Sequence, residues 1–301
     1  MSSMPFLDPI KIEQLINSLN IQIPSKEKFL QLTHIFPIYP QLESNPVINY
    51  ERGILLYSLI AKYKPENVLE IGTAEGYSTL CMAWAMVDHN INGKIFTIDP
   101  KPFDIPVERE ITWEKNLEHN TVSLSTKELW NKFANKEWIK KIEVLTGFSG
   151  EILQKKTKEL PKMDMGFIDG HHAYEAVIHD FYAFLQTASE NFCLLFDDYN
   201  PNENRDVTKV INEEVVPNFD VTLIKTNAKQ QFKEANESEN EADMCWLESN
   251  SLKKPLREIY PKSKSDQIIS KYLKWEKRWK LRKTLNSKIP LLGKFRFRSG
   301  V

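Results

Sequence analysis

The stretch that decides the fold reads Val68-Leu69-Glu70-Ile71-Gly72-Thr73-Ala74-Glu75-Gly76-Tyr77-Ser78-Thr79. A short apolar run suited to a buried strand is followed by two glycines that bracket three residues, and then by a run at helical spacing. Glycine lets a backbone approach a ligand closely, and the N-terminus of a helix offers unpaired N–H groups. We therefore expect a strand, a turn and a helix that together bind a nucleotide-like cofactor.

The same stretch distinguishes between cofactors. The dinucleotide fingerprint G-x-G-x-x-G needs glycines where this chain has Ala74 and Tyr77, which disfavours NAD. Glu70 and Glu75 would repel a pyrophosphate but suit a cationic ligand. S-adenosylmethionine carries a sulfonium and an ammonium group, so we expect this cofactor, bound by Glu70, Gly72, Thr73, Ala74, Gly76, Tyr77 and Ser78.

Strand-like and helix-like runs alternate on both sides of this turn. Strands are expected at residues 67–71, 94–99, 141–146, 164–169 and 191–197, with helices at 77–87, 108–119, 149–154 and 173–185. Such alternation indicates βαβ units and a parallel sheet covered on both faces. Residues 221–226 and 243–248 would add a closing hairpin, and residues 121–138 a small helical insertion. The prediction is an α/β fold with a doubly wound, mainly parallel, seven-stranded Rossmann-like sheet.

Two further positions fit the cofactor. Asp99 ends the second predicted strand, where a carboxylate can accept hydrogen bonds from both ribose hydroxyls. Phe148 and Ser149 follow the third strand and are expected to line an adenine pocket. Alone, each of these would be a surface residue or a plain turn, but together and in this order they favour cofactor binding.

Acidic residues and histidines gather after the next two strands. Asp169 ends one strand and is followed by His171 and His172, whereas Asp197 and Asp198 end the other. Because the carboxyl ends of parallel strands share one crevice, these carboxylates should meet and would need a cation. Oxygen ligands of this kind suit Mg²⁺ or Mn²⁺. The alternative is that the aspartates only cap helices. His179, further along, is expected on a solvated helix face.

This order of motifs resembles the class I, Rossmann-like methyltransferases, with the turn similar to the catechol O-methyltransferase-like form. Asp-Gly-x-His-x-Tyr at 169–174 and Phe-Asp-Asp-Tyr at 196–199 look like the metal-dependent sugar and natural-product O-methyltransferases and the related cephalosporin hydroxylase-like proteins. The resemblance covers roughly residues 48–250.

The resemblance implies that Asp169, Asp197 and Asp198 hold a divalent metal, with Asp169 also beside the cofactor and the reaction. His172 matches the position of a general base. Asp197 stands where Glu is more usual in that family, and Ala74 where many members have Gly. A metal lowers the pKa of a bound hydroxyl, so that a neutral imidazole can take its proton.

The charge of −1 conceals a marked asymmetry. Residues 251–301 contain 16 Lys or Arg against 3 Asp or Glu, whereas the first 250 residues contain 24 against 38. We therefore divide the chain into an N-terminal helical lid or oligomerisation segment (1–47), a methyltransferase domain (48–250) and a basic amphipathic tail (251–301).

The tail has three interpretations. In the first, the aromatic face of the tail packs on the rest of the protein while its cations stay solvated. In the second, the tail attaches to an anionic membrane surface. In the third, the tail binds nucleic acid. The acidic body disfavours nucleic acid. Peripheral membrane contact would suit a lipid-linked or cell-envelope glycan as acceptor. The N-terminal helices could serve as a homo-oligomer contact.

From the remaining features we expect the protein in the cytoplasm, with the inner membrane surface as an alternative location. No stretch approaches about 18 consecutive apolar residues, and the start lacks a basic, then apolar, signal. Cys81, Cys193 and Cys245 are expected as buried free thiols. The expected acceptor is a hydroxyl of a sugar or natural-product-like small molecule. The alternatives are a metal-independent methyltransferase on nitrogen or oxygen, or a hydroxylase-like or non-catalytic member of the fold.

Overall fold

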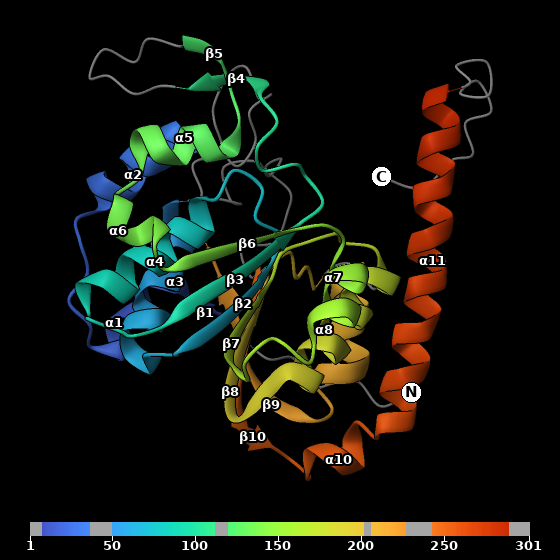
Figure 1. Cartoon of the computed structure of the whole chain (residues 1–301). Helices are drawn as coiled ribbons and strands as arrows, with labels where there is room; N and C mark the ends of the chain where they lie inside the picture. The colour runs from blue at the N-terminus through green and yellow to red at the C-terminus, as the bar shows by residue number, and fades with distance from the viewer. Residues whose placement is uncertain (1–7, 37–49, 112–119, 202–205, 227–242, 289–301) are drawn as a thin grey trace, which may run out of the picture.

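The computed structural model describes residues 8–36, 50–111, 120–201, 206–226 and 243–288. Within them the protein is an α/β fold with a mainly parallel central sheet (Figure 1). The strands of this sheet lie in the order β1-β9-β10-β8-β7-β2-β3-β6. Their bounds are β1 Ile10–Lys11, β2 Asn67–Ile71, β3 Lys94–Asp99, β6 Ile142–Thr146, β7 Met163–Ile168, β8 Ala188–Phe196, β9 Phe219–Lys225 and β10 Met244–Leu252.

The predicted doubly wound sheet is confirmed, with one strand more than the seven expected. All neighbouring strands are parallel except β10, which runs antiparallel to β8 and β9 as the predicted closing hairpin. The extra strand, β1, is only two residues long and pairs with the edge strand β9. So short a segment carries no periodic signal, and its pairing depends on where the N-terminal helices dock.

Helices cover both faces of the sheet (Figure 1). On one side, α3 packs against α4, α1 and α2; on the other, α8 packs against α7 and α11. Their bounds are α1 Ile12–Leu19, α2 Lys26–Ile35, α3 Tyr50–Tyr63, α4 Tyr77–Asp88, α5 Thr126–Phe133, α6 Lys136–Ile139, α7 Ser149–Lys156, α8 Tyr174–Thr187, α9 Asp206–Val210, the π-helical turn η1 Ile211–Val215, α10 Leu256–Ile259 and α11 Lys262–Lys288.

Two hydrophobic cores follow from the alternation of side chains along the strands. In β2, Val68 belongs to the core under α3 and α4, whereas its neighbour Leu69 belongs to the core under α8. Both faces of a central parallel strand are buried, so β2 has almost no exposed residue. β2 lies between β3 and β7, where the chain order of the strands reverses, and ligands of such sheets bind at this point.

The prediction of a helix at 108–119 was wrong for the residues that the structure describes. Val107–Ile111 form strand β4, paired antiparallel with β5 (Asn120–Leu124), and residues 112–119 lie outside the described residues. The alternation of Val107, Arg109 and Ile111 with two glutamates has the period of a strand. The insertion at 121–138 is helical only from α5 onwards, because residues 121–124 belong to β5.

The predicted free thiols are confirmed: Cys81, Cys193 and Cys245 are buried and unpaired with one another. No helix among the residues described has the length and apolarity needed to cross a membrane. The loop at 227–242 and the end of the tail after Pro290 lie outside the described residues.

Candidate active site

The turn between β2 and α4 has the backbone shape that its glycines predict. Gly72 (φ 106°), Ala74 (φ 47°) and Gly76 (φ 95°) all adopt left-handed conformations. A Cβ on Gly72 would lie 2.0 Å from the backbone oxygen of Asp169, so only glycine fits where β7 ends beside the turn. The turn therefore brings the end of β2 directly against the first residue of the acidic cluster.

Asp99 holds this turn from the end of β3. One oxygen of its carboxylate accepts a hydrogen bond from the backbone N–H of Ala74 at 2.8 Å, and the other from that of Lys101 at 2.7 Å. Asp99 is only half-buried, so the same carboxylate remains accessible to a ligand. Its predicted role with the ribose hydroxyls stays a prediction, and its position beside the turn fits that role.

Glu70 is fully buried below the turn. Its carboxylate accepts a hydrogen bond from the hydroxyl of Thr79, and the hydroxyl of Thr73 bonds that of Thr97 nearby. Burial raises the pKa of Glu70 to about 7, against the opposing effect of the threonine hydroxyls. At neutral pH this side chain is therefore partly uncharged, which weakens the expected attraction of Glu70 for a cation.

Glu75 also fails to offer a free charge. Its carboxylate lies 2.9 Å from Nη1 of Arg109 in β4 and pairs with Nζ of Lys101. Its backbone oxygen accepts a hydrogen bond from the indole of Trp130 at 2.8 Å. The acidic flank of the turn is thus internally neutralised, and the inference of a cationic ligand from Glu75 loses its electrostatic basis.

The side chain of Tyr77 is buried in the core, and its predicted role at the cofactor stays a prediction. The hydroxyl of Tyr77 donates to the backbone oxygen of Tyr50 at 3.1 Å. Ser78 follows in the first turn of α4.

A small cavity of about 30 Å³ lies beside the turn. It is lined by Phe36, Arg52, Gly72, Thr73, Ala74, Glu75, Gly76, Tyr77, Ser78 and Asp169. This volume holds about one water.

Phe148 and Ser149 lie where β6 passes into α7. The hydroxyl of Ser149 is buried and donates to the carboxylate of Asp180 at 2.6 Å. The ring of Phe148 is half-buried and meets the indole of Trp279 edge to face, with ring centroids 5.4 Å apart. The predicted adenine pocket is therefore bordered by helix α11, a partner that the motif did not predict.

The acidic cluster at the ends of β7 and β8 contains a cation of its own. Arg52, from α3, is buried, and its Nη1 donates to Asp169 at 2.9 Å. Its other terminal nitrogen, Nη2, pairs with Asp197, which is also buried. Burial raises the pKa of Asp169 well above its ordinary value, while Arg52 opposes this shift. Sequence reasoning missed Arg52, which has no motif around it.

Asp198 and His172 form a second pair beside the first. Nε2 of His172 lies 2.9 Å from a carboxylate oxygen of Asp198, and this hydrogen bond raises the pKa of the imidazole. Asp198 adopts a left-handed backbone (φ 59°). Among the described residues, Asp169, His172 and Asp198 each bring one ligand atom within 4.8 Å of the others.

This donor set fits a divalent cation. It differs from the predicted ligand set, since His172 stands in it and Asp197 lies against Arg52 instead. The role of Asp197 as a ligand stays a prediction. His171, next in the chain, has a pKa lowered by burial, and its ring contacts those of Trp275 and Trp279.

The prediction that His179 lies on a solvated helix face was wrong. It is 1% exposed, its Nδ1 lies 2.8 Å from Asp180, and its ring stacks on that of Tyr272 at 4.0 Å. The solvent side expected for this part of α8 is covered by α11, which no local pattern in α8 reveals.

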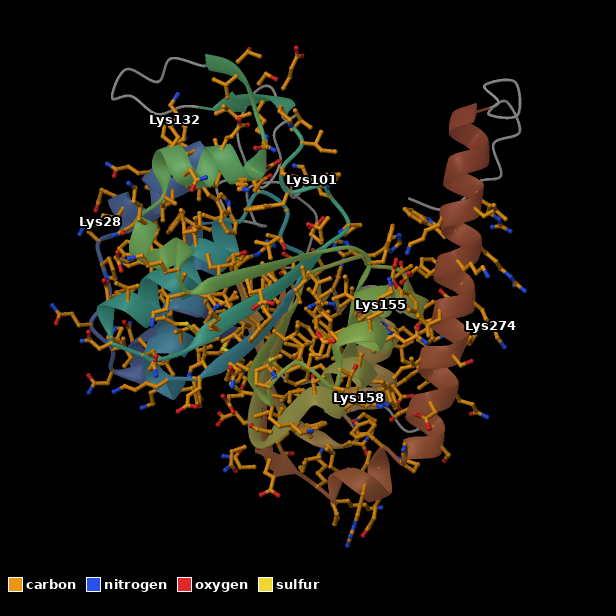
Figure 2. All side chains as sticks on the ribbon, viewed as in Figure 1. Lys28, Lys101, Lys132, Lys155, Lys158 and Lys274 are labelled. Carbon is orange, nitrogen blue, oxygen red and sulfur yellow. The ribbon has the colours of Figure 1, made fainter. Side chains whose placement is uncertain are left out.

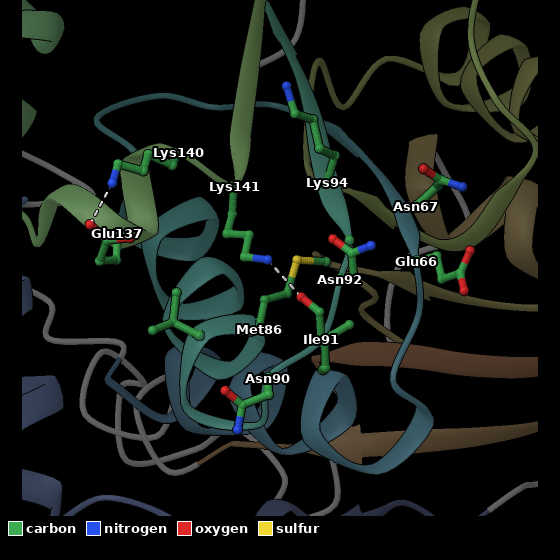
Figure 3. A pocket seen from close by; sticks show the side chains of 12 residues that line it. Glu66, Asn67, Met86, Asn90, Ile91, Asn92, Lys94, Glu137, Lys140 and Lys141 are labelled. Atoms are coloured by element: carbon green, nitrogen blue, oxygen red, sulfur yellow. Dashed lines mark hydrogen bonds and ion pairs between the residues drawn. The ribbon is translucent and has the colours of Figure 1, made fainter.

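A larger cavity, about 640 Å³, lies at the opposite end of the sheet (Figure 3). It is bordered by the residues that begin β2 and β3, Asn67 and Lys94. There Lys141 donates to the backbone oxygen of Ile91 at 2.7 Å, and Lys140 pairs with Glu137. Parallel sheets bind ligands at the carboxyl ends of their strands, so this cavity is distant from the candidate site.

The doubly wound sheet, the left-handed glycine turn and the acid-tipped neighbouring strands define a Rossmann-like α/β fold whose turn is of the kind that binds nucleotide-like cofactors. Residues 69–199, somewhat less than half of the chain, match the family model described as a methyltransferase domain. The match begins in β2 and ends at Tyr199, just beyond Asp198. It thus contains the turn, Asp99 and every predicted acidic residue of the site.

Solved structures with a similar fold include the O-methyltransferase TomG from Streptomyces achromogenes, involved in tomaymycin synthesis and solved with SAM. It is 17% identical, with a TM-score of 0.47, over 78% of this chain and 94% of that one. The O-methyltransferase from Bacillus cereus, solved with SAH, is 17% identical, with a TM-score of 0.46, over 78% and 96%. No curated protein matches this chain in sequence.

Proposed function

We propose that this protein is an S-adenosylmethionine-dependent methyltransferase that transfers a methyl group to a hydroxyl oxygen of a sugar or natural-product-like small molecule, with a divalent metal and His172 as base. The observation that carries the proposal is the grouping of Asp169, His172 and Asp198 around one point at the switch point of the sheet. Asp169, Asp197 and Asp198 gather there with Arg52 and His172, and a divalent cation would add positive charge to this acidic group.

His172 is placed to hold a proton. With Asp198 accepting from Nε2–H, the lone pair of the neutral imidazole lies on Nδ1, which takes the proton of the acceptor hydroxyl. Asp198 then stabilises the imidazolium that forms. S-adenosylmethionine supplies the methyl group on a sulfonium, and the methyl–sulfur bond breaks as the methyl–oxygen bond forms.

The carboxylates of Asp169 and Asp198 would hold Mg²⁺ or Mn²⁺. Such an ion would lower the pKa of a hydroxyl coordinated to it. Arg52 keeps Asp169 fixed at the end of β7, beside Gly72 of the turn. The chain therefore contributes alignment of the two reactants and a proton acceptor, and it needs no covalent intermediate.

The metal-independent alternative rests on Arg52. This arginine already neutralises part of the charge on Asp169 and Asp197, and the Asp198–His172 pair works as a base without a metal. The acceptor oxygen or nitrogen would then be activated by His172 alone. Chelation separates the two mechanisms.

The experiment uses methyl-labelled S-adenosylmethionine and a panel of sugars and phenols. We expect transfer that EDTA abolishes and Mg²⁺ or Mn²⁺ restores. His172→Asn should lower kcat about 10²- to 10⁴-fold, as removal of a general base does, with an unchanged Kd for S-adenosylhomocysteine. Glu137→Gln, in the distant cavity, is the matched control. Full activity in EDTA would establish the metal-independent alternative, and failure of the wild type to bind S-adenosylhomocysteine would remove the cofactor assignment.

A further inference from the structure

Helix α11 presents a ladder of aromatic rings to the body of the protein. Tyr272 stacks on Trp275 with centroids 5.4 Å apart, and Trp275 stacks on Trp279 at 6.5 Å. Spacings of three and four residues place all three rings on one face of the helix. Figure 1 shows α11, in red, running alongside α7 and α8.

The ladder reaches two separate parts of the candidate active site. Trp279 contacts Phe148, after β6, with ring centroids 5.4 Å apart. Trp275 and Trp279 both contact His171, after β7, at 5.6 Å and 6.1 Å. Phe148 belongs to the predicted adenine pocket, and His171 immediately precedes the proposed base. One helix from the basic tail therefore borders both ends of the site.

The helix is docked in a defined position. A Cβ on Gly150, in the first turn of α7, would lie 2.6 Å from the ring of Tyr272, so the two helices touch at this glycine. Glu276 is buried, and Lys280 bonds both Glu276 and Glu151 while its Nζ lies 4.4 Å from the centre of the Phe148 ring. This docking holds Trp279 against the start of α7.

Trp275 and Trp279 are nevertheless only half-buried. The basic residues Lys271, Lys274, Lys277 and Arg278 are exposed, and Figure 2 shows the labelled Lys274 extending from the helix into solvent. The aromatic face of α11 is thus turned to the body, while two indole rings keep surface that a ligand can contact.

We propose that α11 is part of the cofactor site, and that Trp279, together with Phe148, forms the wall against which the purine ring of S-adenosylmethionine packs. The inference follows from the sheet order: the turn lies after β2, Asp99 is the last residue of β3, and Phe148 follows β6, the next strand outward. A cofactor whose amino-acid part lies at the turn and whose ribose lies at Asp99 extends its purine toward Phe148. Trp279 is the large aromatic residue from outside the methyltransferase domain that contacts Phe148. Purines bind well against indole rings.

The test measures Kd for S-adenosylhomocysteine by calorimetry and by quenching of tryptophan fluorescence. Trp279→Ala should raise Kd about 5- to 150-fold, the range seen when a ring that stacks on a base is removed. Adenosine as probe should lose affinity by a similar factor, because only the purine contacts Trp279. Trp279→Phe should retain most of the affinity. Trp275→Ala should raise Kd less, since Trp275 contacts His171 and not Phe148.

Leu281→Ala is the control, because Leu281 is on the same helix and 61% exposed. It should bind both probes as the wild type does. Wild-type binding that is unchanged in Trp279→Ala would overturn the inference while leaving the cofactor site intact. A loss in Trp279→Ala that Trp279→Phe does not restore, accompanied by a lower Tm, would assign Trp279 to helix docking and would also overturn it. Absence of binding by the wild type would instead refute the cofactor site itself.

Discussion

Two acidic clusters border the same cavity, and different cations face them. At the turn after β2, Glu75 has two cationic partners, Arg109 and Lys101. At the ends of β7 and β8, Asp169, Asp197 and Asp198 share one arginine, Arg52, and one histidine, His172. In the first cluster two cations face one carboxylate, whereas in the second one arginine and one histidine face three carboxylates.

This difference in the number of neighbouring cations indicates which acidic residues are candidates for a role in the reaction. A buried carboxylate with its own cations is explained by the fold, since an unpaired buried charge is costly. A group of carboxylates with too few cations needs either protonation or a further positive ligand. By this criterion the fold accounts for the charge of Glu75, and we place the proposed reaction chemistry at Asp169 and Asp198.

The largest effect is expected for Arg52→Met. It would leave two buried carboxylates without their shared cation, and breaking a buried pair in this way costs about 3–5 kcal/mol of unfolding free energy. Arg109→Met should cost less, about 1–3 kcal/mol, because Lys101 still pairs with Glu75. Urea unfolding of both variants measures the difference. Equal losses would show that the two clusters are not balanced differently.

The pH dependence of the unfolding free energy tests whether the buried Glu70, below the turn, is protonated in the folded protein. The pKa of Glu70, about 7 in the folded protein, lies above the ordinary value near 4.5, so the folded state holds a proton that the unfolded state has lost. Glu70 therefore favours folding below pH 4.5, and this contribution is lost as pH rises from 4.5 to 7. The loss is about 3 kcal/mol in size.

Glu70→Gln, which removes this titration, should have an unfolding free energy that falls less than that of the wild type over the same interval. Denaturant unfolding at pH 5 and pH 7.5 measures it. Parallel pH profiles for the two proteins would mean that Glu70 is charged in the fold.

The smallest effect is expected in the distant cavity of Figure 3. Lys140 and Glu137 form an exposed pair there, with side chains 68% and 58% exposed. Pairs of this kind contribute about 0–1 kcal/mol, so Lys140→Ala should leave Tm and cofactor affinity nearly unchanged. A clear loss of S-adenosylhomocysteine binding in this variant would point to a functional role for the cavity and weaken the assignment of the site to the other end of the sheet.

Much of the fold could be predicted because its signals are local. The glycines at 72 and 76 and the apolar strand before them indicated the turn, and the alternation of runs indicated the parallel sheet. Strand β4 was predicted as a helix because a short stretch with alternating glutamates was read at the wrong period. His179 was predicted to be exposed because the pattern of apolar residues in α8 does not indicate that α11 packs over it.

The sequence by itself determined the order of strand, turn and helix, and the positions of Asp99, Asp169 and Asp198 at strand ends. These follow from backbone geometry and side-chain period, which act over a few residues. Only the tertiary structure decided which charges meet. Arg52 and Asp169 are 117 positions apart, and Trp279 reaches Phe148 from a helix outside the domain. Such contacts depend on how helices dock on the sheet, and no local pattern in the chain encodes them.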